Sequence, residues 1–305
     1  MEQTATKRFF YIFLAYLRLG CVSFGGPVAH LGYFREAFVQ RRKWLTEAEY
    51  TELIALCHSV PGPSSSQLGF AIGWLRGGMA GGLAAWLGFT LPSALLMTGA
   101  AYGLLSLKGE AKALIGGLLT AAVAIVASAA FGLARKMCPD FSRGILALVA
   151  AALVYALPGN WVQLLVIGLG AGIGMLLYRG SEVGGGKGTK LSAAISSAYL
   201  WPSIILFALL LLLAVCWPLS SPGALYAKHF EAGALVFGGG HVVLPLLSDS
   251  VVANGLLAES DFLAGYSAAQ AMPGPLFTLA AFNGTVGAPG WTGGIYALIA
   301  IFLPG

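Results

Sequence analysis

The sequence predicts an all-α polytopic membrane protein that contains an inverted-topology internal repeat with broken or re-entrant helices. Of its 305 residues, 58% are hydrophobic and only 10% are charged, which excludes an ordinary soluble globule and a disordered chain. A Pro-Gly-Pro loop occurs twice inside membrane-length apolar segments, at 61–63 and, 212 residues further on, at 273–275. Pro and Gly interrupt helices, and bare backbone at membrane depth is tolerated only where it lines a cavity or is buried in protein.

Two further motifs flank each loop in the same order, which indicates a duplication. Phe24-Gly25-Gly26 lies upstream of the first loop and Phe237-Gly238-Gly239 upstream of the second. Downstream of the loops, Leu91-Pro92 is matched by Leu303-Pro304. Duplicated broken helices in an apolar chain are typical of a transport site between two repeats.

Apolar segments of roughly 17 to 25 residues are long enough to enter or cross a bilayer. Glycine or proline motifs interrupt four of the predicted segments: 9–31, 50–74, 225–248 and 262–287. The uninterrupted segments are 79–106, 111–134, 143–157, 161–178, 198–217 and a last one from about Gly293. We therefore expect a first repeat over 1–178, a linker over 179–197, and an extra transmembrane helix plus an incomplete second repeat over 198–305.

The distribution of basic residues predicts that the two repeats have opposite orientations. Lys and Arg favour cytoplasmic loops, so the cluster Arg41-Arg42-Lys43 places the first repeat's loop, and the N-terminus, inside. The equivalent loop of the second repeat reads Ala253-Asn254-Gly255, with acidic neighbours only. If the interrupted segments return to their own side, five full crossings separate the repeats. The alternative, in which 9–31 crosses fully, separates Lys7 and Arg8 from the basic cluster and is less favoured.

The first candidate site is the loop between segments 50–60 and 64–74. A helix that restarts at Ser64 would turn its free N–H groups and positive dipole end toward the break, which suits an anion. In the alternative, the loop is a proline kink whose serines bond to their own helix backbone. The candidate binding residues of this loop are Pro61, Gly62, Pro63, Ser64, Ser65, Ser66 and Gln67.

The second candidate site is formed by the glycine-rich elements and by the second loop. Adjacent glycines let backbone approach a ligand closely, although they also let two helices pack. In the first repeat the candidates are Ser23, Gly25, Gly26, Pro27 and His30. In the second repeat they are Gly238, Gly239, Gly240, His241, Pro273, Gly274 and Pro275.

Arg18 and Glu231 occupy equivalent positions of the two repeats and carry opposite charges. Charges inside a membrane are costly, which makes both residues candidates for charge or proton coupling. Three alternatives remain open for these residues. They could form an ion pair across the repeats, Arg18 could attract the anion while Glu231 carries a proton, or both side chains could snorkel to the membrane interfaces.

The sequence predicts neither an enzyme nor a cofactor. It has no Walker loop, no His-Glu-x-x-His motif and no Gly-x-Ser-x-Gly elbow, and its four cysteines lack metal-ligand spacing. An intramembrane enzyme that uses Ser64 to Ser66 with His30 or His58 stays a rival, but the spacing does not favour it. The net charge of +5 lies in short clusters beside apolar segments, which indicates membrane orientation and no nucleic-acid partner.

The chain resembles the chromate transporter family over nearly its whole length. The motifs that carry the resemblance are FGGPVAHLGYFREAFVQRRKWL, PGPSSSQLGFAIG and GGLAAWLGFTLPS in the first repeat, and FGGGHVVLPLL, AMPGPLFTLAAFNG and IFLPG in the second. The resemblance implies chromate efflux across the bacterial inner membrane and chromate resistance, with sulfate as a structural analogue. It also implies that the protein lies in the lipid bilayer, and it is compatible with a homodimer.

Two departures from the family pattern affect this expectation. The chain ends at Gly305, so it looks like a C-terminally shortened member, and the first loop has Ser64 where many relatives have Asn. The alternatives are a sulfate or other oxyanion carrier, or an incomplete subunit that needs a partner. Either the membrane potential or proton coupling is expected to drive transport. A potential of about 100 mV favours exit of a dianion by roughly 4.6 kcal/mol.

Labelling of single cysteines tests the predicted orientation. We expect an impermeant thiol reagent to label Gln40→Cys and Asn254→Cys, each in a cysteine-free background, from opposite sides of the membrane. Labelling of both positions from the same side would contradict the inverted arrangement.

Overall fold

The computed structural model describes residues 5–106, 140–157, 161–177, 197–236, 243–288 and 290–305, with a few isolated positions between 107 and 139. Every regular element among these residues is a helix, so the all-α prediction is confirmed for the described part of the chain. Most of the predicted span 111–134, nearly all of the predicted linker 179–197 and the candidate residues Gly238 to His241 lie outside it.

The chain divides into two compact units. The smaller unit, 123–189, contains α6 (Phe141–Ala156) and α7 (Trp161–Leu177), which pack against each other. The larger unit joins 1–122 to 190–305 and therefore contains both Pro-Gly-Pro loops. The candidate site lies entirely within this larger unit.

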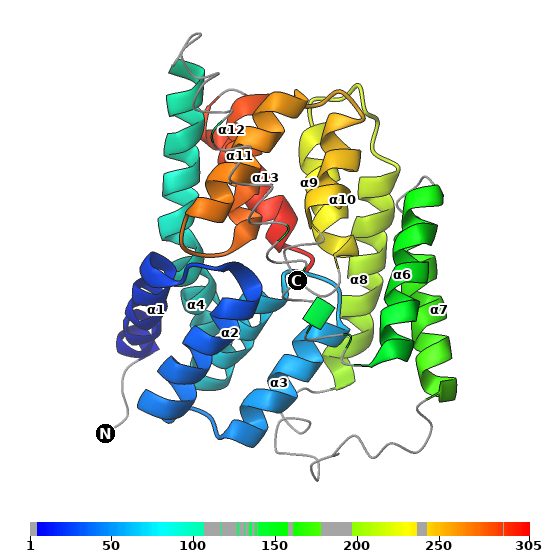
Figure 1. Cartoon of the computed structure of the whole chain (residues 1–305). Helices are drawn as coiled ribbons and strands as arrows, with labels where there is room; N and C mark the ends of the chain where they lie inside the picture. The colour runs from blue at the N-terminus through cyan, green and yellow to red at the C-terminus, as the bar shows by residue number, and fades with distance from the viewer. Residues whose placement is uncertain are drawn as a thin grey trace. The chain divides into compact units, whose positions relative to one another are not determined.

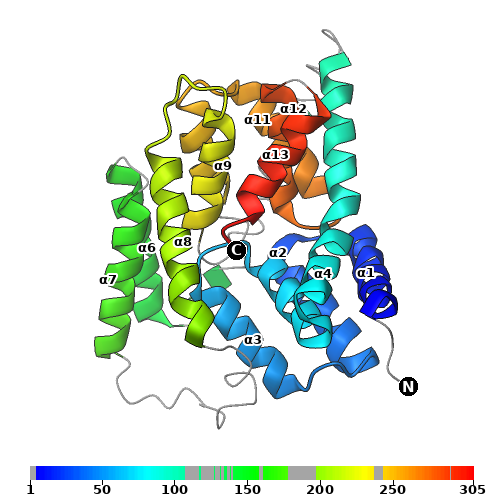
Figure 2. The ribbon, with the colours of Figure 1, turned by 180° about the vertical axis from the view of Figure 1, so that it is seen from behind.

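The two repeats contain the same elements in the same order (Figures 1 and 2). The first repeat consists of α1 (Ala5–Val22), α2 (Gly26–Phe34), the π-helix η1 (Arg35–Arg41), α3 (Glu47–Ser59) and α4 (Ser64–Ser106). After α8 (Ser197–Val215), the second consists of α9 (Ala224–Leu235), α10 (Val243–Leu247), the π-helix η2 (Ser248–Val252), α11 (Glu259–Ala271), the 3-10 turn η3 (Leu276–Thr278), α12 (Leu279–Gly287) and α13 (Trp291–Phe302).

Three of the four predicted helix interruptions lie in the described residues, and all three are present. Helix α1 ends before Gly25, and Gly25 and Gly26 have φ of 93° and 72°. Helices α3 and α11 both end before a Pro-Gly-Pro loop, whose glycines Gly62 and Gly274 have φ of 127° and 98°. Because side chains rarely adopt these angles, the glycines fix where each helix stops.

In each repeat, the helix after the Pro-Gly-Pro loop folds back on itself as a tight hairpin held by glycines. Non-helical angles at Gly77 and Gly78 break α4 after Arg76, so its two parts correspond to α12 and α13 of the second repeat. A Cβ on Gly81 would lie 2.3 Å from the Gly73 carbonyl oxygen, and a Cβ on Gly293 would lie 2.4 Å from that of Gly284. The hairpins therefore depend on direct backbone contact, as in small-residue helix packing.

The repeats have separate hydrophobic cores that α4 connects. The first core gathers aromatic rings from α1, η1 and α4, including Tyr16, Phe38 and Phe89. The second core includes Met97 and Ala101, which lie in the C-terminal part of α4. Helix α4 thus spans both repeats, and Figure 1 shows it running beside both groups of helices.

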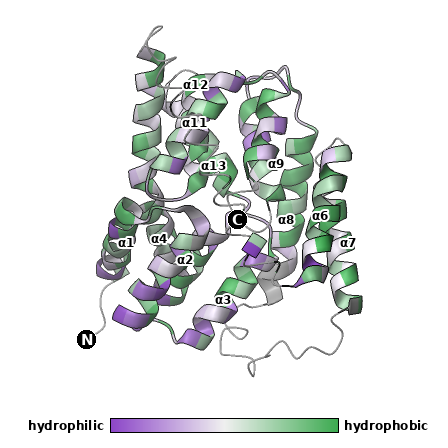
Figure 3. Ribbon diagram, viewed as in Figure 1, coloured by the Kyte–Doolittle hydropathy of each residue, from purple (hydrophilic) through white to green (hydrophobic). Residues whose placement is uncertain are grey.

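The hydropathy of the described helices fits the predicted apolar segments. One of them, α4, is long and apolar enough to qualify as a membrane span by length and composition, and six shorter helices or helix segments are apolar. Figure 3 shows hydrophobic residues along most of α8 and α13, whereas hydrophilic residues gather along η1 and α3. The orientation of the helices in a membrane stays a prediction.

The close backbone contact in the hairpin predicts that adding one methyl group to it lowers the stability of the protein. Gly284→Ala would place its Cβ about 2.2 Å from the Gly293 carbonyl oxygen, so we expect a loss of about 1–3 kcal/mol in the free energy of unfolding. Gly99→Ala is the matched control, because no atom lies within 4 Å of its Cβ position. Thermal unfolding in detergent measures both variants, and equal midpoints would contradict the tight hairpin.

Candidate functional site at the Pro-Gly-Pro breaks

The two Pro-Gly-Pro loops are tied to each other's repeat by reciprocal backbone hydrogen bonds. The Gly62 N–H donates to the Val236 carbonyl at 2.7 Å, and the Gly274 N–H donates to the Ser23 carbonyl at 2.9 Å. Ser23 and Val236 are equivalent residues, since each directly precedes a Phe-Gly-Gly motif. Contacts in which each partner repeats the other's role are the mark of a two-fold relation.

A second reciprocal contact lies beside the first. A Cβ on Gly62 would lie 3.0 Å from the Cα of Gly305, and a Cβ on Gly274 would lie 2.9 Å from the Cβ of Ser93. Ser93 and Gly305 are again equivalent, because each follows a Leu-Pro motif. In the described residues, each Pro-Gly-Pro loop therefore lies against the residue that follows the other repeat's Leu-Pro motif.

His30 connects the first glycine-rich element to the start of α4. Its buried ring lies 3.2 Å from the Ser23 carbonyl through Nε2 and 3.4 Å from Ser65 Oγ through Nδ1. A carbonyl only accepts, so we assign the proton to Nε2, and Ser65 then donates to Nδ1. The ring also packs edge-on against Phe89 at 5.1 Å between centroids. The Ser23 carbonyl thus accepts from both His30 and Gly274.

Five buried polar atoms around this contact have no hydrogen-bond partner in the described part of the chain. Three belong to the first turn of α4, one follows Phe89, and one belongs to Ser23. Buried polar atoms are normally paired, so each of these atoms calls for an explanation, such as an ordered water or a bound ion. The atoms are Ser23 Oγ, Ser64 Oγ, Ser66 Oγ, Gln67 Oε1 and Thr90 Oγ1.

The second loop is not a copy of this polar cluster. Thr278 is equivalent to Ser66, but its hydroxyl donates to the Pro275 carbonyl at 2.8 Å and accepts from Ser93 Oγ at 2.9 Å. Its neighbours Leu276 and Phe277 are buried and apolar. The first loop lacks the corresponding bond because Gly305, the equivalent of Ser93, has no hydroxyl.

The other predicted residues of the breaks mainly shape the backbone. Gly25 caps α2 in a left-handed conformation, and Gly26 and Pro27 form its half-buried first turn. The N–H groups of Gly62 and Gly274 are already bonded across the repeats. The surrounding prolines, Pro61, Pro63, Pro273 and Pro275, are buried or half-buried.

Of the three alternatives for Arg18 and Glu231, the structure does not show the ion pair between them. Glu231 is buried on α9 and pairs with Lys228 at 2.5 Å, whereas Arg18 is exposed on α1. Equivalent positions of two repeats need not lie together, and these two lie about one turn before the ends of α1 and α9. The spacing of three residues between Lys228 and Glu231 is the signal that finds the observed pair.

A further buried polar pair escaped the sequence analysis. His229 lies 2.7 Å from the Leu225 carbonyl through Nδ1, and its Nε2 lies 3.4 Å from Asn283 Nδ2. Its equivalent in the first repeat is Tyr16, whose hydroxyl donates to the Gly69 carbonyl at 2.9 Å. The two repeats thus tie the helix before the break to the helix after it with different side chains.

Two broken helices that meet reciprocally beside buried, unpaired hydroxyls are the arrangement of a transporter built from repeats. The chain belongs to the chromate transporter family, which matches it over residues 10–175 and 223–305. The resemblance found in the sequence is therefore confirmed, and membership implies a membrane protein.

Individual relatives agree with this assignment. The chain is 34% identical to a probable chromate transport protein of Synechococcus elongatus, over 95% of its own length and 72% of the relative's. It is 27% identical to a chromate transport protein of Pseudomonas aeruginosa, over 96% and 70% of the two lengths. It is 30% identical to one of Cupriavidus metallidurans, over 95% and 70%. No solved structure matches the chain.

A double-mutant cycle tests the bond between the repeats. We expect Ser93→Ala and Thr278→Val to be coupled by about 0.5–1.5 kcal/mol in the free energy of unfolding, because both remove the same hydrogen bond. Ser93→Ala combined with Thr98→Val is the control, since the Thr98 hydroxyl bonds to Ala94 of its own helix. Additive effects in both pairs would contradict the observed contact.

Proposed function

We propose that the chain transports chromate across the membrane and binds it at the start of α4. The cluster of buried, unpaired hydroxyls on Ser23, Ser64, Ser66 and Thr90 carries this proposal. Relatives that are 27% to 34% identical are named chromate transport proteins, which supports chromate as the substrate.

The chemistry of these groups suits a tetrahedral dianion. Desolvating two negative charges is costly, so a binding site must return several strong hydrogen bonds. Each hydroxyl rotates to donate to a substrate oxygen, and the N-terminal end of α4 adds its positive dipole. Gln67 plays another role, because its Nε2 donates to the Pro61 carbonyl and leaves only an acceptor oxygen. Neutral donors also avoid a permanent countercharge that would slow release.

We propose further that the repeats have opposite orientations in the bacterial inner membrane, with the N-terminus in the cytoplasm. The reciprocal bonds at Gly62 and Gly274 support a two-fold relation between the repeats. The basic loop Arg41-Arg42-Lys43 and its uncharged counterpart Ala253-Asn254-Gly255 support opposite sides. In an inverted pair, alternate rocking of the two repeats opens a site between them to each side in turn.

Efflux needs no ATP in this proposal. A membrane potential of about 100 mV, negative inside, favours exit of a dianion by roughly 4.6 kcal/mol. This driving force would sustain the outward gradient that chromate resistance requires. Glu231, held by Lys228 on the buried side of α9, remains our candidate proton carrier if transport is coupled. Sulfate has the same shape and charge, so it should compete with chromate.

Serine substitutions separate substrate binding from stability. We expect Ser64→Ala and Ser66→Ala each to weaken chromate binding about tenfold or more, because each removes a donor to a charged oxygen. The unfolding temperature should stay unchanged or rise, since neither hydroxyl has a partner in the described structure. Counterflow of labelled chromate in liposomes and thermal unfolding give the two measurements.

Ser267→Ala is the matched control for these variants. Its hydroxyl is equally buried but donates to the Leu263 carbonyl of its own helix. We expect it to leave chromate affinity unchanged. Wild-type affinity in both Ser64→Ala and Ser66→Ala would place the binding site elsewhere.

A further inference from the structure

A basic groove of about 900 Å³ runs between α1 and the α2–η1 segment. Its walls are largely apolar, and Leu17, Leu19 and Val22 of α1 contribute to them. Three arginines line the same groove: Arg18 from α1, and Arg41 and Arg42 from the end of η1 and the residue after it. The groove is therefore apolar along its length and positive at one part of it.

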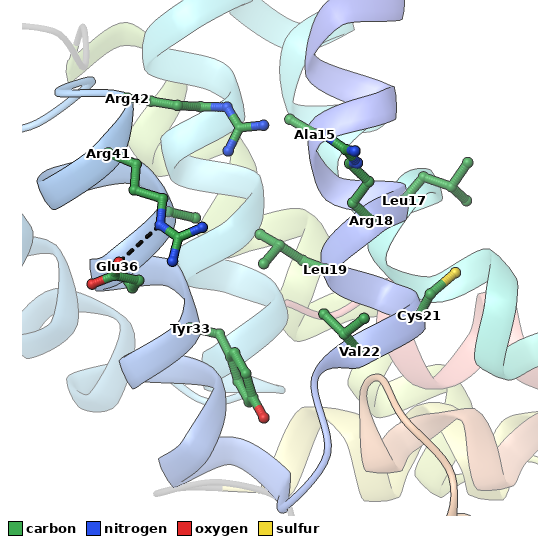
Figure 4. A pocket seen from close by; sticks show the side chains of 11 residues that line it. Ala15, Leu17, Arg18, Leu19, Cys21, Val22, Tyr33, Glu36, Arg41 and Arg42 are labelled. Atoms are coloured by element: carbon green, nitrogen blue, oxygen red, sulfur yellow. Dashed lines mark hydrogen bonds and ion pairs between the residues drawn. The ribbon is translucent and has the colours of Figure 1, made fainter.

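The charges in the groove are not balanced. Arg41 bonds to Glu36 at 2.8 Å, which is the ion pair drawn in Figure 4. Arg18 and Arg42 form no ion pair with another described residue. The Arg42 guanidinium lies 5.9 Å from the ring centres of Phe38 and Trp44, and Figure 4 shows its side chain reaching toward α1. Two guanidinium groups therefore remain available to an anion.

The equivalent face of the second repeat is covered by a helix. Leu17 and Cys21 correspond to Phe230 and Ala234 of α9, which pack in one cluster with Ala214 of α8. No described helix takes the place of α8 beside α1, and Val22 is 53% exposed there. The basic residues are also confined to the first repeat, because Glu231, Asn254 and Gly255 replace them in the second. The groove thus has an uncovered apolar face and a charge of its own.

We propose that this groove binds an anionic phospholipid, with an acyl chain along its apolar wall and the phosphate on Arg18 and Arg42. Guanidinium groups hold phosphate oxygens through paired hydrogen bonds, and basic pockets between membrane helices bind anionic headgroups. Trp44, whose ring centre lies 5.9 Å from the Arg42 guanidinium and 5.3 Å from that of Arg76, is the kind of aromatic residue that lies at the headgroup level.

The observations favour a lipid over two other occupants. A small oxyanion would gain nothing from the apolar wall, and none of the residues with unpaired hydroxyls lines the groove. A second copy that placed the same groove against itself would bring Arg18, Arg41 and Arg42 close to their own counterparts. Like charges in such an interface are repulsive.

The exposed thiol of Cys21, which lines the groove, reports its occupancy, and exposed Cys216 at the end of α8 is an internal control. The full chain is purified in an uncharged detergent, and phosphatidylglycerol or phosphatidylcholine with the same acyl chains is added. Modification of each cysteine by a thiol reagent is followed by peptide mass spectrometry. We expect phosphatidylglycerol to slow modification of Cys21 at least about fivefold and phosphatidylcholine to have little effect, with Cys216 unchanged in both.

Charge variants sharpen the test. Arg18→Gln combined with Arg42→Gln should raise the phosphatidylglycerol concentration for half-protection about 25-fold, or about fivefold for each guanidinium removed. Arg35→Gln is the control, because Arg35 lies outside the groove. Its guanidinium donates two hydrogen bonds to Glu47, at 2.7 and 2.9 Å, and lowers the pKa of that carboxyl. In this control variant, phosphatidylglycerol should protect Cys21 from modification as it does in the wild type.

Four results would overturn the proposal. They are equal protection by the two lipids in the wild-type chain, unchanged protection in the double variant, protection of Cys21 by chromate or phosphate alone, and protection that grows with protein concentration without lipid. The first result is decisive even if the double variant does not fold. None of these measurements depends on transport, so the lipid site and the chromate site succeed or fail separately.

Discussion

Two backbone hydrogen bonds, from Gly62 to Val236 and from Gly274 to Ser23, are the contacts on which the rest of the structure depends. A broken helix leaves N–H and carbonyl groups without partners, and in an apolar chain such groups must be satisfied by protein. Here each repeat satisfies the break of the other. Neither break is complete alone, and small residues are required at the positions where the loops approach Ser93 and Gly305.

The two copies of the break differ in how their side chains are bonded. In one half, Ser93 bonds to Thr278 and closes the break. In the other half, Gly305 leaves the equivalent Ser66 without a partner, beside the unpaired hydroxyl of Ser64. One break is therefore closed by a side-chain hydrogen bond, whereas hydroxyls at its counterpart have no partner in the described residues. The two halves also differ in the apolar residues Leu276 and Phe277, which stand in the closed loop where the first loop has Ser64 and Ser65.

Much of this architecture is predictable from the sequence, because Pro and Gly mark helix ends and repeat at a fixed spacing. The breaks at Gly25-Gly26 and at both Pro-Gly-Pro loops follow from that signal. The π-helical segments η1 and η2 do not, since no residue type marks a π-helix. The sequence treats Ser64, Ser65 and Ser66 alike, but His30 engages only Ser65, and that choice depends on tertiary packing. Sequence equivalence offers Arg18 as one possible partner for Glu231, but Glu231 bonds to Lys228, its neighbour on the same helix.

The binding claim is tested most directly by locating a tetrahedral dianion in the protein. Selenate has the shape and charge of chromate, and its selenium gives an anomalous X-ray signal in crystals of the full chain. We predict a selenium peak at the first turn of α4, within hydrogen-bond distance of Ser64 Oγ and Ser66 Oγ. A peak that instead occupies the arginine groove beside α1, or that lies against the closed loop at Thr278, would contradict the account.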